Sequence, residues 1–406
     1  MGKATKKKFE AVRASTASQI KEYLINRYLS DSERIKDGKE TRTSHILIGP
    51  PGVGKTRAVM EAGQEIARRT GREFLVYDDR KFFDLWSGEL TELGQRVLEE
   101  PERYFVNVVF PLNLAEPTDL TGIPQVVGSL GIVRFYPHFW IKICAVTPGF
   151  LVLDDFLDTQ REDTLSVGYR VILDKVLGFT PMHRDRAVIA TSNTPEHSSL
   201  SRLMPVPLAT RWEVHEISAP SVDEWEEWMK ATFGEGWDKR IYAFLKAFEA
   251  EGSILKLPSE PETAKPYPCP RSWTEVARGL HFGPVDVDGL VGPEWGQKLR
   301  AFLSVEVNVE ELMEAPEKWG QLEYDAKCMA CCMLASWLQG GGEIPKALPL
   351  LKAISGDSRE FLAILGRMVS EGILTKLILA DRELWEQFDK VLKVREKIRG
   401  TVRAGR

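Results

Sequence analysis

GPPGVGKT, residues 49–56, is a glycine-rich stretch that fits the pattern G-x-x-x-x-G-K-[ST]. It follows the short apolar run HILI and precedes RAVMEAGQEIARR, which has the composition of a helix. Glycines in such a loop let backbone N–H groups face phosphate oxygens, and the N-terminus of the next helix adds a partial positive charge. The stretch therefore predicts a phosphate-binding loop in an α/β protein. The alternative is a glycine turn before a surface helix.

The residues of this loop have separate expected roles. Lys55 is expected to reach the β- and γ-phosphates of a nucleotide, and Thr56 to supply a hydroxyl group to Mg²⁺. The whole loop is expected to bind the nucleotide: Gly49, Pro50, Pro51, Gly52, Val53, Gly54, Lys55 and Thr56.

Polar side chains follow two other apolar runs. FLVLDDF (150–156) predicts a buried strand with two aspartates at its carboxyl end, where ligands bind in parallel sheets. Asp154 is expected to orient Mg²⁺ through its water shell, and Asp155 to polarise the attacking water. Asn193 follows the run AVIAT, and its amide is expected to hold that water or the γ-phosphate. The alternatives are an acidic strand end that solvates a loop and a turn-forming asparagine.

Buried-strand candidates alternate with helical stretches as far as residue 218, which is typical of a mainly parallel sheet with helices on both faces. Beyond it the strand signal fades, and 257–270 contains five prolines. Four parts are predicted: an N-terminal helix and basic tail at 1–36, an α/β nucleotide-binding domain at 37–218, a helical lid at 219–290, and a C-terminal helical domain at 291–406.

Composition narrows the class of protein. The 406 residues include 54 Lys+Arg and 59 Asp+Glu, a net charge of −5, which does not favour general nucleic-acid binding but allows a local basic channel. No apolar run is long enough to cross a bilayer, and the basic N-terminus lacks the apolar segment of a secretory signal, so we expect a cytoplasmic protein without a membrane.

Cysteine and histidine give no metal pattern in the sequence. Cys328, Cys331 and Cys332 lie within a helical pattern of apolar residues, which predicts that they are small core residues. The six histidines are scattered along the chain, and no metal site is predicted from them.

Taken in order, these motifs resemble those of the AAA+ ATPases, and within them the MoxR-type group. The matching segments are Walker A GPPGVGKT, Walker B FLVLDD, sensor 1 at Asn193, the arginine-finger segment PVPLATRW, and PCPRSWTEVAR. EPTDLTGIP is similar to the family's segment before its helix-2 insertion, and the resemblance covers roughly 40–285.

The resemblance implies a five-stranded parallel sheet of order 5-1-4-3-2, a helical lid, a C-terminal helical extension, and a hexameric ring that binds ATP and Mg²⁺ between subunits. It implies an arginine finger at Arg211, at the far end of the sheet from its own loop, and sensor 2 at Arg271. Arg271 pairing with Glu275 is the alternative. Arg202 is a second candidate for an arginine acting on a neighbouring subunit. Asp155 stands where the family usually has glutamate, which leaves slow hydrolysis open.

Three functions are compatible with these features. The first is an ATP-driven remodeller of protein complexes, with a von Willebrand factor A-domain protein as a partner. The second is a nucleic-acid motor or restriction-type NTPase subunit, and the third a slow nucleotide-dependent scaffold. The segment 122–140 predicts a hairpin, which either grips a substrate or covers a sheet edge.

Overall fold

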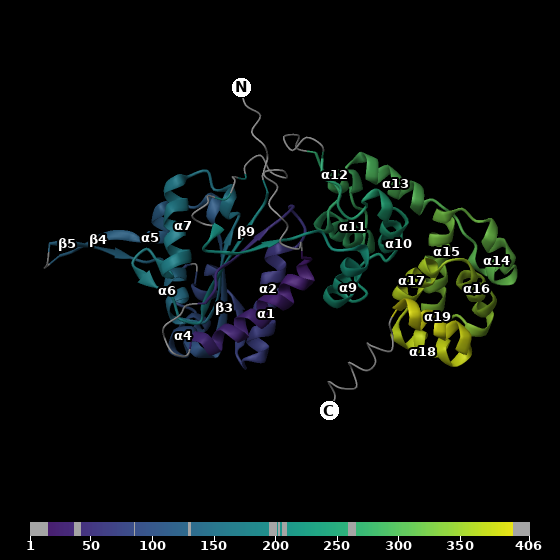
Figure 1. Ribbon diagram of the computed structural model, residues 1–406, viewed down its shortest axis with the longest axis horizontal. Coiled ribbons are helices and arrows are strands. Elements are labelled where there is room, and N and C mark those ends of the chain that lie inside the picture. The colour runs from purple at the N-terminus through teal and green to yellow at the C-terminus, as the bar shows by residue number, and fades with distance from the viewer. Residues whose placement is uncertain are drawn as a thin grey trace, which may run out of the picture. The chain divides into compact units, whose positions relative to one another are not determined.

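The computed structural model describes residues 15–35, 42–84, 86–128, 131–194, 201, 204, 209–258 and 265–392. The chain divides into two compact units. The first is Met1–Pro220 with Pro258–Ala264, and the second is Ser221–Leu257 with Lys265–Arg406. The first unit is drawn in purple to teal and the second in green to yellow (Figure 1). The boundary predicted at residues 290 and 291, between a helical lid and a C-terminal helical domain, stays a prediction.

A parallel six-stranded sheet forms the centre of the first unit, in the order β10-β1-β9-β6-β3-β2. Its strands are β1 (His45–Ile48), β2 (Glu73–Val76), β3 (Tyr104–Pro111), β6 (Gly149–Asp154), β9 (Arg186–Ser192) and β10 (Glu213–Glu216). The strands β10-β1-β9-β6-β3 follow the expected order 5-1-4-3-2. The expected count of five was one too low, because EFLV also pairs, in parallel, with β3 and becomes an edge strand.

The central strands are buried on both faces, which explains their almost continuous apolar sequences. Side chains alternate between two sides: Leu151 and Leu153 of β6 join a core with α7 residues such as Val171, whereas Val152 points the other way. Helices α1 and α2 lie on one side of the sheet, with α6 and α7 on the other (Figure 1). The main helices of this unit are α1 (Ala17–Arg34), α2 (Lys55–Arg69), α3 (Asp79–Phe82), α4 (Glu92–Glu99), α5 (Pro117–Thr121), α6 (Phe139–Val146) and α7 (Glu162–Asp174).

A hairpin of β4 (Ile123–Val127) and β5 (Ile132–Tyr136) extends from this unit, as the sequence predicts (Figure 1). It pairs antiparallel, with Ile123 opposite Tyr136. Several of its large apolar side chains are exposed: Ile123, Val126, Ile132, Val133 and Tyr136.

The second unit is helical in its described part and has one continuous apolar core, which includes Trp225, Trp273 and Leu334. Its main helices are α9 (Val222–Phe233), α10 (Arg240–Ala247), α11 (Pro270–Phe282), α12 (Val287–Val291), α13 (Pro293–Leu303), α14 (Val309–Glu314), α15 (Tyr324–Gln339), α16 (Ile344–Asp357), α17 (Arg359–Met368), α18 (Glu371–Ala380) and α19 (Arg382–Leu392). Cys328, Cys331 and Cys332 are buried on α15, which confirms them as core residues. Among the described residues, no helix is both long and apolar enough to span a bilayer.

Candidate functional site

The glycine-rich loop connects β1 to α2 through a backbone that requires glycine. Gly52 and Gly54 have φ of 80° and 95°, in the left-handed region. Gly49 is constrained by its neighbour instead, because a Cβ there would lie 2.2 Å from the carbonyl oxygen of Ile217. The Gly49 N–H donates to Ser192 O at 3.2 Å. The loop is therefore held against both strands that flank β1.

Lys55, the first residue of α2, is buried and has three oxygen acceptors within reach. Its Nζ lies 2.9 Å from Gly49 O, 2.8 Å from Pro50 O and 3.1 Å from Asn193 Oδ1. An ammonium group has three protons to donate, so these contacts use its full capacity. A phosphate that binds Lys55 has to replace at least one of them. The two carbonyls belong to the loop itself, and they hold the side chain over it.

Thr56 and Asp154 meet at the carboxyl end of β6. The Thr56 hydroxyl donates to Asp154 Oδ1 at 2.9 Å. Thr191, near the end of the adjacent strand β9, donates a second hydrogen bond to the same oxygen. Both hydrogen bonds end on Oδ1, and neither involves Oδ2 of Asp154. Thr191 was not predicted from the sequence, although its place one strand away from Asp154 follows from β9 pairing with β6.

Asn193 connects Lys55 to an acid that sequence analysis missed. Its Nδ2 donates to Asp158 Oδ2 at 2.8 Å, while its Oδ1 accepts from Lys55. Ser201 donates to the other oxygen of Asp158. Asp158 is 7% exposed and lies at the end of the short 3₁₀ turn Phe156–Asp158. The signal was a third aspartate in DDFLD, but only the fold brings it to Asn193.

Asp155 follows β6 with φ 52° and ψ 43°, a left-handed conformation that aspartate and asparagine adopt more readily than most residues. Its neighbour Asp154 is the last residue of the strand, so the chain turns sharply between the two acids. Asn113 Nδ2 lies 3.4 Å from Asp155 Oδ2. This turn sets the direction of the Asp155 side chain independently of the strand.

The residues at this edge of the sheet fit Mg²⁺ and a nucleoside triphosphate. Thr56 and Asp154 offer oxygen ligands of the type that Mg²⁺ binds, directly or through water. The glycines of the loop, with the N-terminus of α2 directly behind them, form a backbone suited to phosphate oxygens. Lys55 adds the positive charge. These groups come from the carboxyl ends of β1, β9 and β6, three adjacent strands.

The three predicted arginines are placed differently. Arg211 is exposed and lies two residues before β10, at the amino end of that strand. β10 lies beside β1 and parallel to it. Arg211 is therefore separated from its own loop by the length of these strands, and not by the width of the sheet. Arg271 is exposed in the first turn of α11 in the second unit. Arg202 lies outside the described residues, as does the first half of PVPLATRW, residues 205–208.

No family model matches the sequence, and no curated protein matches it. Solved structures do match: PCH-2 from C. elegans at 13% identity, covering 72% of this chain and 64% of that one, with a TM-score of 0.29. A mutant of RuvB from Thermotoga maritima matches at 14% identity, covering 84% and 91%, with a TM-score of 0.31. NtrX from Brucella abortus, in complex with ATP, matches at 15% identity, covering 85% and 70%, with a TM-score of 0.35.

The class of fold follows from the topology of the sheet itself. The glycine-rich loop lies between β1 and α2, Asp154 ends β6, Asn193 follows β9, and β10 pairs with the outer side of β1. The fold is therefore that of an AAA+ P-loop NTPase core, with β2 added at one edge of the sheet.

Proposed function

We propose that this protein is a ring-forming ATPase that binds ATP with Mg²⁺ between subunits and hydrolyses it to remodel a protein complex, in the manner of the MoxR-like group. The observation that carries the proposal is the convergence of Lys55, Thr56, Asp154 and Asn193 on one edge of the sheet. A cation, a hydroxyl, a carboxylate and an amide are the groups that phosphoryl transfer from a nucleotide needs.

Each residue has a defined part in that reaction. Lys55 exchanges a carbonyl contact for a phosphate oxygen and so neutralises charge on the β- and γ-phosphates. Bound Mg²⁺ would further neutralise the phosphate oxygens, with Thr56 and Asp154 as the residues that hold it. Asp155 accepts a proton from the attacking water, and Asn193, oriented by Asp158, positions that water or the γ-phosphate.

The position of Arg211 supports a site shared between subunits. Arg211 precedes the amino end of β10, whereas its own loop follows the carboxyl end of β1, the strand paired with β10. The four paired residues of these strands separate the two by about 13 Å. An arginine side chain is too short to bridge that distance and contact its own γ-phosphate. Arg211 therefore acts on the nucleotide of a neighbouring subunit, and Arg271 acts as sensor 2 from the helical unit.

Lys55→Ala tests the binding site directly. We expect isothermal titration calorimetry to show ATP binding by the wild-type chain and a loss of roughly a hundredfold or more in affinity in the variant, because the loop loses its cation. Lys142→Ala, which removes an exposed lysine of the same unit, is the matched control and should bind as the wild type does. Equal affinity in all three proteins contradicts the proposal.

The exposed apolar hairpin β4–β5 favours a protein substrate, since it offers apolar contact area and, in its described part, Arg134 as the single basic side chain. ATPase rates measured with single- and double-stranded DNA, with RNA, and with a von Willebrand factor A-domain protein separate this role from that of a nucleic-acid motor. Stimulation by nucleic acid alone favours the motor. A rate too slow to measure under all conditions favours a nucleotide-dependent scaffold.

A further inference from the structure

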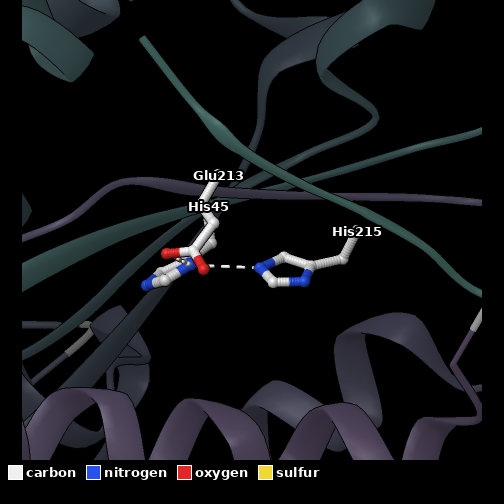
Figure 2. Close-up of side chains that lie close together, drawn as sticks. All are labelled: His45, Glu213 and His215. Atoms are coloured by element: carbon white, nitrogen blue, oxygen red, sulfur yellow. Dashed lines mark hydrogen bonds and ion pairs between the residues drawn. The ribbon is translucent and has the colours of Figure 1, made fainter. Parts of the chain in front are cut away.

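Two histidines and a glutamate meet on one face of the sheet, at the opposite end of β1 from the phosphate loop. His45 is the first residue of β1, and it lies directly across from Glu213, the first residue of β10. His215 is two residues further along β10 and so points to the same face (Figure 2). The sequence shows no metal pattern for this pair of histidines, because 170 positions separate two residues that strand pairing makes neighbours.

The atoms of this cluster are spaced as ligands of one ion. His45 Nδ1 lies 3.3 Å from His215 Nε2 and 3.6 Å from Glu213 Oε2. The three ligand atoms all lie within 4.8 Å of one another. Two nitrogens bound tetrahedrally to one Zn²⁺, each at about 2.05 Å, are separated by about 3.3 Å. Both spacings from His45 are therefore close to the edge of such a tetrahedron.

Two side chains of α1 contact Glu213: Tyr23 donates a hydrogen bond that supports metal binding, and Arg27 places a positive charge near the proposed ion. Tyr23 of α1 donates to the second carboxylate oxygen, Glu213 Oε1, which orients the group. Arg27 Nε lies 3.6 Å from Glu213 Oε2, but it lies equally close to Asp31, so its charge is partly balanced. His45 is buried, so its ring is held in place by the surrounding protein.

We propose that His45, Glu213 and His215 bind a divalent transition metal, with Zn²⁺ as the best match to a set of two imidazoles and one carboxylate. The fourth ligand position is open to water. The ion joins β1 to β10, the edge strand, at the end where pairing begins. Because Arg211 lies two residues before Glu213, the ion also holds the segment that carries this arginine. The site itself does not depend on the proposed ATPase function.

Zinc titration of the full, untagged chain tests the proposal, after treatment with EDTA, its removal, and without nucleotide, because phosphates also bind metals. We expect calorimetry to show one equivalent of Zn²⁺ per chain in the wild type. His215→Gln and Glu213→Gln should each weaken binding roughly tenfold or more. The matched control is His183→Gln: His183 also lies beside a glutamate, with Nε2 2.9 Å from Glu102 Oε1, but in the part of the chain that the structure describes it belongs to no group of three possible metal ligands. It should bind as the wild type does.

Visible absorption of Co²⁺ bound to the wild type tests the site without any variant, so its result does not depend on whether the variants fold. Co²⁺ in a tetrahedral site of nitrogen and oxygen ligands gives intense visible absorption bands, whereas octahedral Co²⁺ gives weak ones. We expect intense bands that Zn²⁺ abolishes by competition. Weak bands or none in the wild type, no stoichiometric Zn²⁺ binding, or equal binding by folded His215→Gln all overturn the proposal and leave a hydrogen bond between two imidazoles.

Discussion

Lys55 and Asn193 are 138 positions apart in the sequence, yet their side chains are joined by a hydrogen bond of 3.1 Å. The contact exists because β9 pairs with β1 in register, Ser192 beside Ile48, so that both strands end at the same edge. Asp158 holds the other end of the Asn193 amide at 2.8 Å. The amide is thus fixed between a cation and a buried carboxylate, which suits a residue that has to orient a reacting group.

Removing this amide should slow turnover more than it weakens binding. We expect Asn193→Ala to lower kcat about a hundredfold, the loss typical of one positioned donor at a reacting centre, with a smaller change in ATP affinity. A steady-state phosphate-release assay and calorimetry measure the two effects.

Asp158→Ala tests whether Asp158 acts through Asn193. If it does, the double variant should be little slower than Asn193→Ala alone, because the two residues form one unit. If the losses in kcat of the two single variants add fully in the double variant, Asp158 has a separate role.

Asp155→Asn should stop turnover and leave ATP binding intact, since an amide cannot accept the proton of the attacking water. Asparagine also tolerates the left-handed backbone at this position, so the fold should not change. Asp155→Glu restores an acid with a longer side chain, but glutamate adopts this backbone less readily. We therefore expect it to be slower than the wild type in the same phosphate-release assay. A faster rate would mean that the short aspartate limits catalysis.

Arg211→Ala should reduce turnover about a thousandfold with binding retained, the loss expected for an arginine finger. Mixing it with Lys55→Ala tests action between subunits. Arg211→Ala subunits keep a working loop, and Lys55→Ala subunits still offer Arg211, so co-assembled rings should regain activity that each variant lacks alone. Native mass spectrometry confirms that mixed rings form. Mixed rings without activity would place Arg211 outside the neighbour's site.

Lys175 should make stability depend on pH. Its side chain is buried against Ser44, and burial lowers its pKa to about 7 from an ordinary 10.5. Between pH 7 and pH 10.5 the Lys175 side chain is protonated in the unfolded chain but neutral in the native state, so the free energy of unfolding rises with pH. Below about pH 7 the native state also has to bury the charged form, and the destabilisation is complete. Lys175→Met keeps the volume and removes the charge.

We expect Lys175→Met to be more stable than the wild type at pH 6 by on the order of 5 kcal/mol, because the pKa of Lys175 falls from 10.5 to about 7 and each pKa unit corresponds to about 1.4 kcal/mol. The difference should shrink toward pH 10. Urea unfolding of both proteins across this range measures it, and Lys142→Met, at an exposed position, is the control. A difference that does not vary with pH would mean that Lys175 keeps an ordinary pKa.

The sequence alone was enough for the order of the local elements. GPPGVGKT determines its own loop, because glycine is needed at Gly52 and Gly54 for positive φ, and the apolar runs determine strands that must be buried on both faces. The identity of Lys55, Thr56, Asp154 and Asn193 as one candidate site also followed, since parallel strands bring their carboxyl ends to one edge. These are consequences of short-range geometry and of one repeating topology.

Only the tertiary structure decided which side chains touch across strands. Asp158 and Thr191 became part of the site because a turn and a strand register placed them there, and His45 met His215 because β10 pairs with β1 and not with another strand. The sixth strand, β2, likewise depends on an edge of β3 being free to pair. Contacts between side chains on neighbouring strands depend on register, and a shift of one residue would turn each side chain to the opposite face.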